Sequence, residues 1–484
     1  MKSDSKNLPP VFLSAIPLCV LVFLISSIVY VFGSDALAGA SQIALLVAAA
    51  IAVGFGVFFG YTSWQKFECE VVKKISEVSQ AIIILLLIGA LSGAWMVSGI
   101  VPMFIYCGLQ IISPECFLFV ACVICAIVSL ITGSSWTTIA TIGIALIGIG
   151  KALGFSDGWI AGAIISGAYF GDKISPLSDT TVLASSSSGT PLFTHIRYML
   201  YTTIPSLIIA LLIYTIYGLT ITASQEIHAQ VISTGIKNTF NLTPFLFIVP
   251  AITGLLIAKK APPIVVLFLS TLFAMILAII FQPQILHKIS PDETDGICSI
   301  FKGVMISVYG TTNTDTGIEL LNKLVSTKGM AGMMSTIWLI LCAMVFGASM
   351  SATGMLESIM MLFVRFTKSA VSLVASTACV GTFMNTICGD QYLSIIMITN
   401  MFRKTYEDAG FESRLLSRTT EDSVTVTSAL VPWNTCGMTQ STVLGVSVFT
   451  YAPFAFFNLV SPLMTILVAA IGYKIFRNGV PLRK

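Results

Sequence analysis

Charged side chains are scarce in this sequence, and their scarcity excludes most classes of protein. Aspartate, glutamate, lysine and arginine together make up 10% of the 484 residues, whereas a soluble globular domain has about 25%. A chain with so few charges does not cover a water-facing surface. The net charge of +3 is also too small to indicate a nucleic acid as partner.

Signatures of catalysis and of nucleotide binding are missing as well. The sequence has three histidines and no phosphate-binding loop of the G-x-x-x-x-G-K-[S/T] type, which argues against an ATP-driven pump. We find no nucleophile–base pair and no paired histidine–cysteine cluster, so we expect neither an enzyme nor a cofactor or structural metal. The eleven cysteines lie mostly in apolar runs, where cysteine packs as a small hydrophobic residue.

Long hydrophobic runs fill most of the chain. Hydrophobic residues account for 56% of the sequence, and runs of about 20 apolar residues span a bilayer as helices. A membrane β-barrel would instead show segments of about ten residues with alternating polarity. We therefore predict an all-α polytopic protein that crosses a lipid bilayer eleven to fourteen times, beginning at 11–32.

The basic residues predict how the chain is oriented in the membrane. Lys66, Lys73 and Lys74 lie together in one connecting segment, and further basic residues gather at 403–418 and 474–484. Connecting segments rich in lysine and arginine stay on the cytoplasmic side. We therefore expect both termini in the cytoplasm.

Two polar regions interrupt the apolar pattern. The stretch "GDKISPLSDTTVLASSSSGT" places Asp172, Lys173 and Asp179 between apolar segments, and a second polar region surrounds 420–440. A charge at the bilayer centre costs roughly 2.5–3.5 kcal/mol. One interpretation of the first stretch is an aqueous loop. The other is an interrupted transmembrane helix whose unwound backbone lines a binding site.

Short motifs favour the second interpretation, because each half of the chain contains a similar pair. "GSSWTT" at 133–138 resembles "GTFMNT" at 381–386, and "DTTVLAS" at 179–185 resembles "DSVTVTS" at 422–428. Paired polar breaks of this kind indicate a transporter site built from discontinuous helices. We predict one integral membrane transporter domain over residues 1–484, with repeats at about 79–218 and 331–457.

Carbonyls, hydroxyls and carboxylates at such breaks form the oxygen shell that a hard cation such as Na⁺ prefers. A carboxylate there binds either a proton or Na⁺, and exchange follows if the protein reorients only when that carboxylate is neutralised. Asp179 is our first candidate, because the hydroxyls of Ser178 and Thr180 flank it and the motif comparison pairs it with Asp422. Lys173 is expected to serve as the counter-ion of Asp172 or as a second titrating group.

Together, "GDKISPLSDTTVLAS", "GSSWTT", and "LVPWNTCG" behind "TEDSVTVTS" resemble the NhaC family of Na⁺/H⁺ antiporters, within the ion-transporter superfamily, over roughly residues 10–476. The resemblance implies a secondary antiporter of the bacterial inner membrane, with two inverted repeats that each contain a re-entrant hairpin and an interrupted helix. It implies Na⁺ and H⁺ as transported ions. Family members also exchange malate and lactate, other organic anions or amino acids, so these solutes are the alternative substrates. Homodimers are common among related transporters.

The resemblance also implies a set of ion-binding residues, carried over motif by motif. The first interrupted helix supplies Asp172, Lys173, Ser175, Ser178, Asp179, Thr180 and Thr181, and its partner supplies Asp422, Thr425, Asn434 and Thr435. We assign Na⁺ itself to Asp179, Thr180, Asp422 and Asn434. Asp390 is a candidate acid at the second hairpin, with the capping of a broken helix as its alternative.

Overall fold

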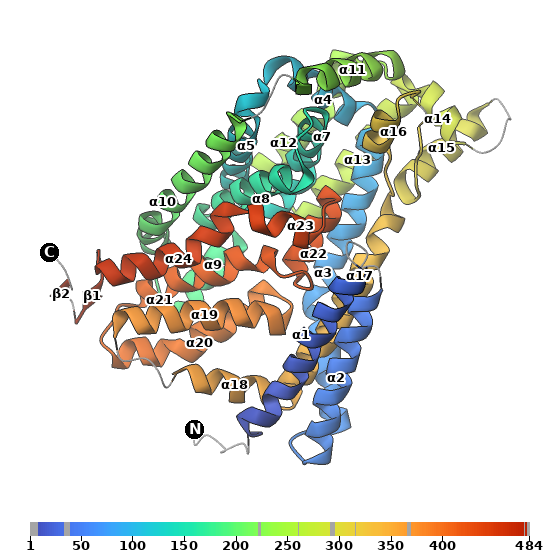
Figure 1. The fold of residues 1–484 in the computed structure, drawn as a ribbon. Helices are drawn as coiled ribbons and strands as arrows, with labels where there is room; N and C mark the ends of the chain where they lie inside the picture. Colours follow the sequence, from blue (N-terminus) through green and yellow to red (C-terminus); the bar gives the residue numbers. More distant parts are fainter. Residues whose placement is uncertain are drawn as a thin grey trace.

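The computed structural model describes residues 8–32, 39–220, 224–259, 261–290, 296–314, 316–364, 369–478 and 480–481. Helices make up almost all of this part of the chain, which confirms the predicted all-α class (Figure 1). Two short strands, β1 (Phe476–Arg477) and β2 (Val480–Pro481), pair near the C-terminus.

The described helices follow one another along the chain in this order. The first part of the chain contains α1 (Val11–Phe32), α2 (Ala40–Phe58), α3 (Trp64–Val97), α4 (Ile100–Ile111), η2 (Pro114–Cys116), α5 (Phe117–Thr132), α6 (Ser135–Thr138), η3 (Ile139–Gly143), α7 (Ile144–Ala152), α8 (Asp157–Ile174), α9 (Asp179–Ser188), α10 (Leu192–Gly218) and α11 (Ser224–Thr239). The middle contains η4 (Pro244–Phe247), α12 (Ile248–Ala258), α13 (Pro263–Phe281), α14 (Pro283–Ile289), α15 (Ile297–Tyr309) and α16 (Glu319–Val325). The last part contains η5 (Met330–Met333), α17 (Met334–Ala352), α18 (Met355–Val364), α19 (Ala370–Cys388), α20 (Gln391–Asp408), α21 (Ser413–Thr420), η6 (Glu421–Thr425), η7 (Ser428–Leu430), α22 (Thr435–Leu444), α23 (Val448–Tyr451), η8 (Ala452–Phe454) and α24 (Phe456–Ile471).

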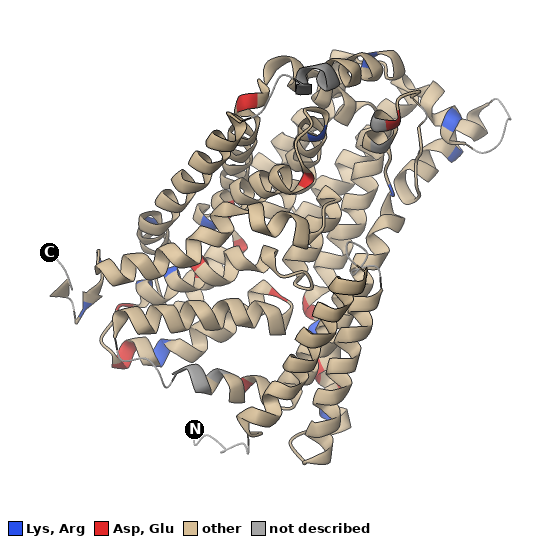
Figure 2. Cartoon of the chain, in the orientation of Figure 1, with Lys and Arg blue, Asp and Glu red and all other residues tan. Residues whose placement is uncertain are grey.

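Nine of the described helices are long and apolar enough to cross a membrane, or up to eleven if each of two bent pairs is one span. The prediction of eleven to fourteen crossings therefore agrees only at its lower end. Predicted spans at 158–170 and 390–402 correspond to α8 and α20, whose three and four charged residues make them more polar than an ordinary membrane helix. Figure 2 shows that charges are sparse on most of the other helices.

Helix α3 is the longest element, with 34 residues, and it lies between two groups of helices. On one side it packs with α17, which also contacts α2. In Figure 1 the helices α19 to α24 occupy the other side. The buried hydrophobic residues form two clusters, one that includes α2, α17, α19 and α20 and one that includes α5, α7 and α8. The face of α3 between these groups is where both large cavities of the protein lie.

Close helix packing sets the position of the polar break after α8. A Cβ atom added to Gly167 or Gly171 would overlap the backbone oxygens of Cys122 and Ala126 on α5. Small residues four positions apart allow helices to approach this closely in membranes. The C-terminal end of α8, and with it Asp172, therefore lies beside the C-terminal end of α5.

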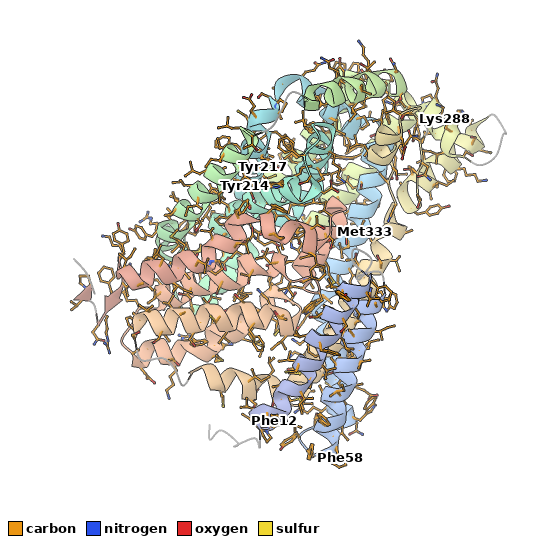
Figure 3. The ribbon with its side chains drawn as sticks, in the orientation of Figure 1. Phe12, Phe58, Tyr214, Tyr217, Lys288 and Met333 are labelled. Carbon is orange, nitrogen blue, oxygen red and sulfur yellow. The ribbon has the colours of Figure 1, made fainter. Side chains whose placement is uncertain are left out.

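A hydroxyl network fixes the opposite side of α8. Ser166 donates to the Tyr214 hydroxyl at 2.8 Å, and Tyr214 donates to the backbone oxygen of Phe454 at 2.7 Å. Trp159 of α8 stacks on Tyr217, with ring centroids 3.6 Å apart. Figure 3 shows both tyrosines on α10, next to α8. Helix α8 is thus held from two sides.

Several helix ends in the first half of the chain have a counterpart 256 residues later. Gly133 ends α5 with φ 68°, and Gly389 ends α19 with φ 65°. The N-caps of α9 and α22, Ser178 and Asn434, have the same spacing. The same spacing joins the glycines that end α9 and α22, Gly189 and Gly445, whose φ values are 75° and 65°.

This spacing corrects the motif comparison made from the sequence. Gly381, which the comparison pairs with Gly133, lies inside α19. At the spacing of the helix ends, Asp179 corresponds to Thr435, and Asp422 corresponds to Ser166. The motif pairs are therefore wrong, because short serine- and threonine-rich patterns recur by chance whereas caps mark helix ends. The repeat boundaries at about 79–218 and 331–457 stay a prediction.

Candidate functional site

A cavity of about 670 Å³ lies where three helix ends meet. These are the turn between α5 and α6, the break between α8 and α9, and the N-terminus of α20. Four carboxylates line the cavity, and its described lining residues include no lysine or arginine: Glu77, Asp172, Asp179 and Asp390. We call it the acidic cavity.

The turn between α5 and α6 brings one helix start to the cavity wall. Gly133 turns the chain in the left-handed conformation, and the Ser134 side chain then caps α6 by accepting from the backbone N–H of Thr137 at 3.2 Å. A Cβ atom on Gly133 would lie 2.7 Å from the carbonyl carbon of Leu177. Glycine is therefore required here both for its φ and for the close approach to the break.

The break between α8 and α9 is held by two serines. The Ser175 hydroxyl donates to the backbone oxygen of Leu130 at 2.9 Å and accepts from the N–H of Leu177 at 3.2 Å. The Ser178 side chain caps α9 and lies 2.9 Å from the Thr180 hydroxyl. The helix is thus interrupted inside the protein, with its free backbone groups satisfied by side chains.

Asp172 is the buried carboxylate of the acidic cavity. It is 6% exposed, and its Oδ2 accepts from both the backbone N–H and the hydroxyl of Ser135, at 3.1 and 2.7 Å. Ser178 lines the same cavity. Because both bonds from Ser135 reach one oxygen, Oδ1 retains capacity for a further ligand. The contact between Ser135 and Asp172 joins the α5–α6 turn to the break between α8 and α9.

Asp179 occupies a more open position in the same cavity. It is the first residue of α9, it is exposed, and it makes no side-chain hydrogen bond to another described residue. Its neighbours Thr180 and Thr181 are buried, and the Thr181 hydroxyl donates to the backbone oxygen of Lys173 at 2.9 Å. The structure therefore brings Asp172 and Asp179 into one cavity but places only Asp172 in the interior.

Asp390 caps a helix, as one of its two alternatives expected, and its role as an acid stays a prediction. Its side chain caps α20 by accepting from the N–H of Leu393 at 3.0 Å, and it also lines the acidic cavity. Its second oxygen accepts from the Thr435 hydroxyl at 3.2 Å. Asp390 thereby ties the second hairpin to the start of α22.

Both polar atoms of the Asn434 side chain form hydrogen bonds within the protein. Its oxygen accepts from the N–H of Cys436 at 3.0 Å and so caps α22, while its nitrogen donates to the backbone oxygen of Asn385 at 3.1 Å. The N–H of Thr435 donates to the oxygen of Gly389 at 2.8 Å. The second break therefore docks on the α19–α20 turn, as the first break docks on the α5–α6 turn.

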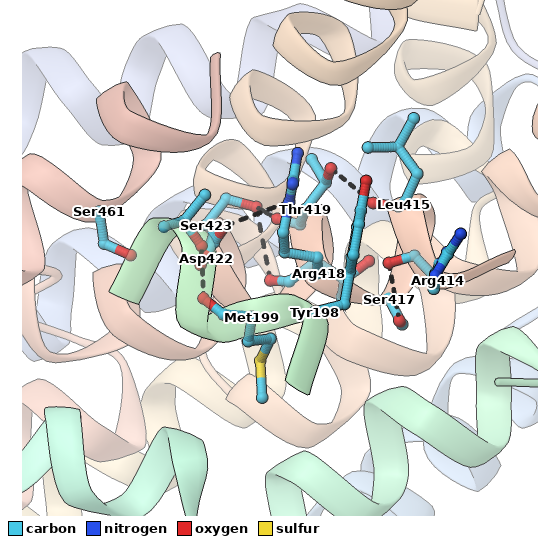
Figure 4. Close-up of polar contacts among 12 residues, drawn as sticks. Tyr198, Met199, Arg414, Leu415, Ser417, Arg418, Thr419, Asp422, Ser423 and Ser461 are labelled. Carbon is cyan, nitrogen blue, oxygen red and sulfur yellow. Dashed lines mark hydrogen bonds and ion pairs between the residues drawn. The ribbon is translucent and has the colours of Figure 1, made fainter. Parts of the chain in front are cut away.

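Lys173 points away from Asp172, which overturns its expected role as the counter-ion. Its ammonium forms an ion pair with Asp422 and donates to the Ser461 hydroxyl at 2.9 Å. Asp422 also accepts from Thr202 at 3.1 Å, and the Nε of Arg418 lies 3.9 Å from its other oxygen. Figure 4 shows Asp422 with Arg418 and Ser461 near it. Lys173, Arg418 and Asp422 are all fully buried. Consecutive helix residues differ by about 100° in direction, so neighbours in the chain reach different partners.

The four residues assigned to Na⁺ consequently have different surroundings. Asp179 and Thr180 line the acidic cavity, Asp422 pairs with Lys173, and Asn434 caps α22. Thr425, also on the predicted list, donates to Glu421 at 2.8 Å inside a π-helical turn, a feature frequent at functional sites. The described residues contain no group of three or more histidine, cysteine or acidic side chains placed to hold a metal.

Two residues at this site, Ser135 beside the acidic cavity and Glu77 on its wall, were not predicted from the sequence. Ser135 holds Asp172 with two hydrogen bonds, and it belongs to the quoted "GSSWTT" motif, whose position after Gly133 was the available signal. Glu77 lines the cavity and pairs with Lys74 at 3.4 Å. Glu77 lies in the same segment as Lys66, Lys73 and Lys74, whose charges predict only the orientation of the chain.

Comparison with known proteins agrees with the transporter architecture. The model of the Na⁺/H⁺ antiporter family matches residues 7–186 and 167–473. The chain is 35% identical to the Malate-2H(+)/Na(+)-lactate antiporter of Bacillus subtilis (strain 168), with 89% of each chain covered. It is also 35% identical to the Na(+)/H(+) antiporter NhaC of the same organism, covering 89% of this chain and 91% of that one. The NhaC antiporter of Alkalihalophilus pseudofirmus is 35% identical, with 89% and 90% covered. The chain is therefore a multi-pass membrane protein that belongs to the Na⁺/H⁺ antiporter family, as its motifs indicate.

Proposed function

We propose that this protein exports Na⁺ in exchange for H⁺ by alternating access, in the inner membrane of a bacterium and with both termini in the cytoplasm. The observation that carries the proposal is Asp172, a buried carboxylate on the wall of an acidic cavity, held by Ser135 at the adjacent hairpin tip. Membership of the antiporter family supports the exchange reaction.

The geometry supports a simple exchange cycle. An unneutralised carboxylate is costly to move through an apolar environment, so the site changes its side only when Asp172 holds a proton or Na⁺. The Ser135 hydroxyl donates to this carboxylate, and Ser178 and Thr180 line the same cavity, where their hydroxyls supply further oxygen donors. Na⁺ and H⁺ then compete for one group, and each turnover exchanges one for the other.

We place Asp172 ahead of Asp179 in this cycle, reversing the order expected from the sequence. Asp172 is buried and held in place by Ser135, whereas Asp179 is exposed in the same cavity. Asp179 is proposed as an entry residue that attracts cations. We propose Asp390 as a positioning residue for the second break and Asp422 as the partner of Lys173.

The test is proton flux in proteoliposomes with an imposed pH difference and a pH-sensitive dye. Addition of Na⁺ should dissipate the pH difference with the native protein, and Asp172→Asn should abolish this response. Glu407→Gln is the matched control, because Glu407 is an exposed acid paired with Arg403 at the surface, and it should retain full exchange. Normal exchange by Asp172→Asn would remove Asp172 from the mechanism.

Exchange of organic anions is the alternative, since one relative is named a malate–lactate antiporter. The positive side chain that kept this alternative open, Lys173, is ion-paired with Asp422. The same liposomes decide the matter: if Na⁺ dissipates the pH difference only with malate, lactate or an amino acid present, the organic solute is the substrate. Homodimerisation stays a prediction from the resemblance.

A further inference from the structure

Helix α3 borders a second cavity, of about 830 Å³, next to the acidic cavity. Residues of α3 between Glu77 and Ile88 line the acidic cavity. The lining of the second cavity starts at Ile88 and extends past the end of α3 to Ile105. Ile88 lines both. The two cavities therefore follow one helix in succession, with Ile88 at the boundary.

The segment from α6 to α7 and helix α22 follow the same order, with the acidic cavity first and the second cavity after it. Trp136 and Thr137 of α6 line the acidic cavity, and residues 144–151 of α7 line the second cavity. Helix α22 starts beside Asp390, at the acidic cavity, and its residues from Met438 onward line the second cavity. Helix α3, the segment from α6 to α7, and helix α22 thus each extend from one cavity to the other.

The two cavities have opposite charge. The charged residues that line the second cavity are Lys151, Asp157 and Lys328. Lys151 and Asp157 pair at 3.3 Å, whereas the exposed Lys328 has no ion-pair partner in the described part of the chain. When all groups are ionised, the described lining sums to +1 here and to −4 in the acidic cavity, where Lys74, outside the lining, pairs with Glu77. We call the second cavity the basic cavity.

Both cavities reach water, so these charges act on dissolved ions. The Glu77 side chain is 40% exposed, and those of Lys151 and Asp157 are 33% and 44% exposed. Water-filled clefts with low-dielectric walls focus the field of their lining charges and change the local ion concentration. Na⁺ is therefore enriched in the acidic cavity and depleted in the basic one.

We infer that this opposite charge makes the two sides of the antiporter unequal: the acidic cavity gathers Na⁺, and the basic cavity, through Lys328, promotes its release. The inference builds on the proposed Na⁺/H⁺ exchange. The lysine-rich start of α3, predicted to be cytoplasmic, lies at the acidic cavity's end of that helix, so Na⁺ is gathered from the cytoplasm. Ion gradients alone set the end-point of exchange, so the asymmetry appears as different KM values for Na⁺ on the two sides.

The test compares right-side-out with inside-out membrane vesicles that contain Lys328→Glu. At low ionic strength the variant should lower the KM for Na⁺ on the basic-cavity side by about three- to tenfold, because a repelling charge becomes an attracting one. The KM on the other side should stay unchanged. The shift should shrink when choline chloride is raised to about 0.3 M, since salt screens exposed charges.

Lys288→Glu is the matched control. It makes the same charge change on α14, at the end of the molecule opposite Phe58 (Figure 3), and Lys288 lines neither cavity. Its two KM values should equal those of the native protein. If native vesicles exchange Na⁺ for H⁺ but Lys328→Glu leaves both KM values unchanged, or shifts both equally, this inference is overturned. If native vesicles show no exchange, the proposed function itself fails.

Discussion

Lys173, Asp422 and Arg418 put three charges into the interior with none of them exposed. Lys173 and Arg418 are both positive, and Asp422 is the acid they share, through an ion pair with Lys173 and a 3.9 Å approach to Arg418. Removing one partner of a buried pair leaves an uncompensated charge and costs about 3–5 kcal/mol. Lys173 and Asp422 are not equivalent here, because two cations share the one acid, Asp422.

Asp422→Asn should therefore destabilise the protein more than Lys173→Met. The first change leaves two buried cations without their acid, whereas the second leaves Asp422 beside Thr202 and Arg418. The measurement is thermal unfolding of purified protein in detergent. Lys173→Met/Asp422→Asn, which leaves one cation, should unfold at a higher temperature than Asp422→Asn. Equal unfolding temperatures for all variants would show that the pair contributes nothing to stability.

At this scale the sequence predicts which residues matter better than it predicts their partners. Charges at 172 and 173 stand out in an apolar chain, and Asp172 does lie at a cavity. The partner of Lys173, however, is 249 residues away, and one step along a helix turns a side chain by about 100°. No local pattern encodes that Asp172 meets Ser135 while Lys173 meets Asp422.

At the scale of elements, the helix ends determine the site. Two turns, α5–α6 and α19–α20, each receive one interrupted helix, and side-chain caps at Ser134, Ser178, Asp390 and Asn434 satisfy the helix starts. A glycine followed by a capping residue is visible in the sequence at both turns. Composition-based motif matching overlooked it, because serine and threonine occur throughout these segments.

Gly133→Ala should impair transport more than Gly445→Ala. Both glycines have positive φ, 68° and 65°, so both substitutions strain the backbone. Only at Gly133 would the new Cβ meet the backbone of Leu177, whereas nothing lies within 4 Å of a Cβ at Gly445. We expect Gly133→Ala to lower the Na⁺-dependent proton flux at least tenfold by separating Ser135 from Asp172. Similar losses in both variants would mean that strain, and not the contact with the break, is responsible.

At the scale of the whole molecule, the two cavities should open to opposite sides of the membrane. Gln80 lines the acidic cavity and Ser441 lines the basic one. In a background whose exposed cysteines are replaced, Gln80→Cys should react with a membrane-impermeant thiol reagent from the cytoplasmic side only. Ser441→Cys should react from the other side only. Labelling of both positions from one side would contradict the arrangement along α3.

The overall architecture was the most predictable level. Hydrophobic runs identify an all-α membrane protein, because each span must bury about 20 apolar residues. The count of spans was less predictable, since α8 is a polar helix that is mostly buried and α20 carries charges at its C-terminal end. The cavities were not predictable, because they form between segments hundreds of residues apart.

The lengths of α9 and α22 have an electrical consequence. Each has ten residues and is about 15 Å long, half of a hydrocarbon core of about 30 Å. Their outer ends, Gly189 and Gly445, are exposed, and their inner ends are the caps Ser178 and Asn434. An ion at Asp172 has therefore crossed about half of the transmembrane voltage. At 100 mV this amounts to about 1.2 kcal/mol per elementary charge, so voltage should influence loading from either side to a similar degree.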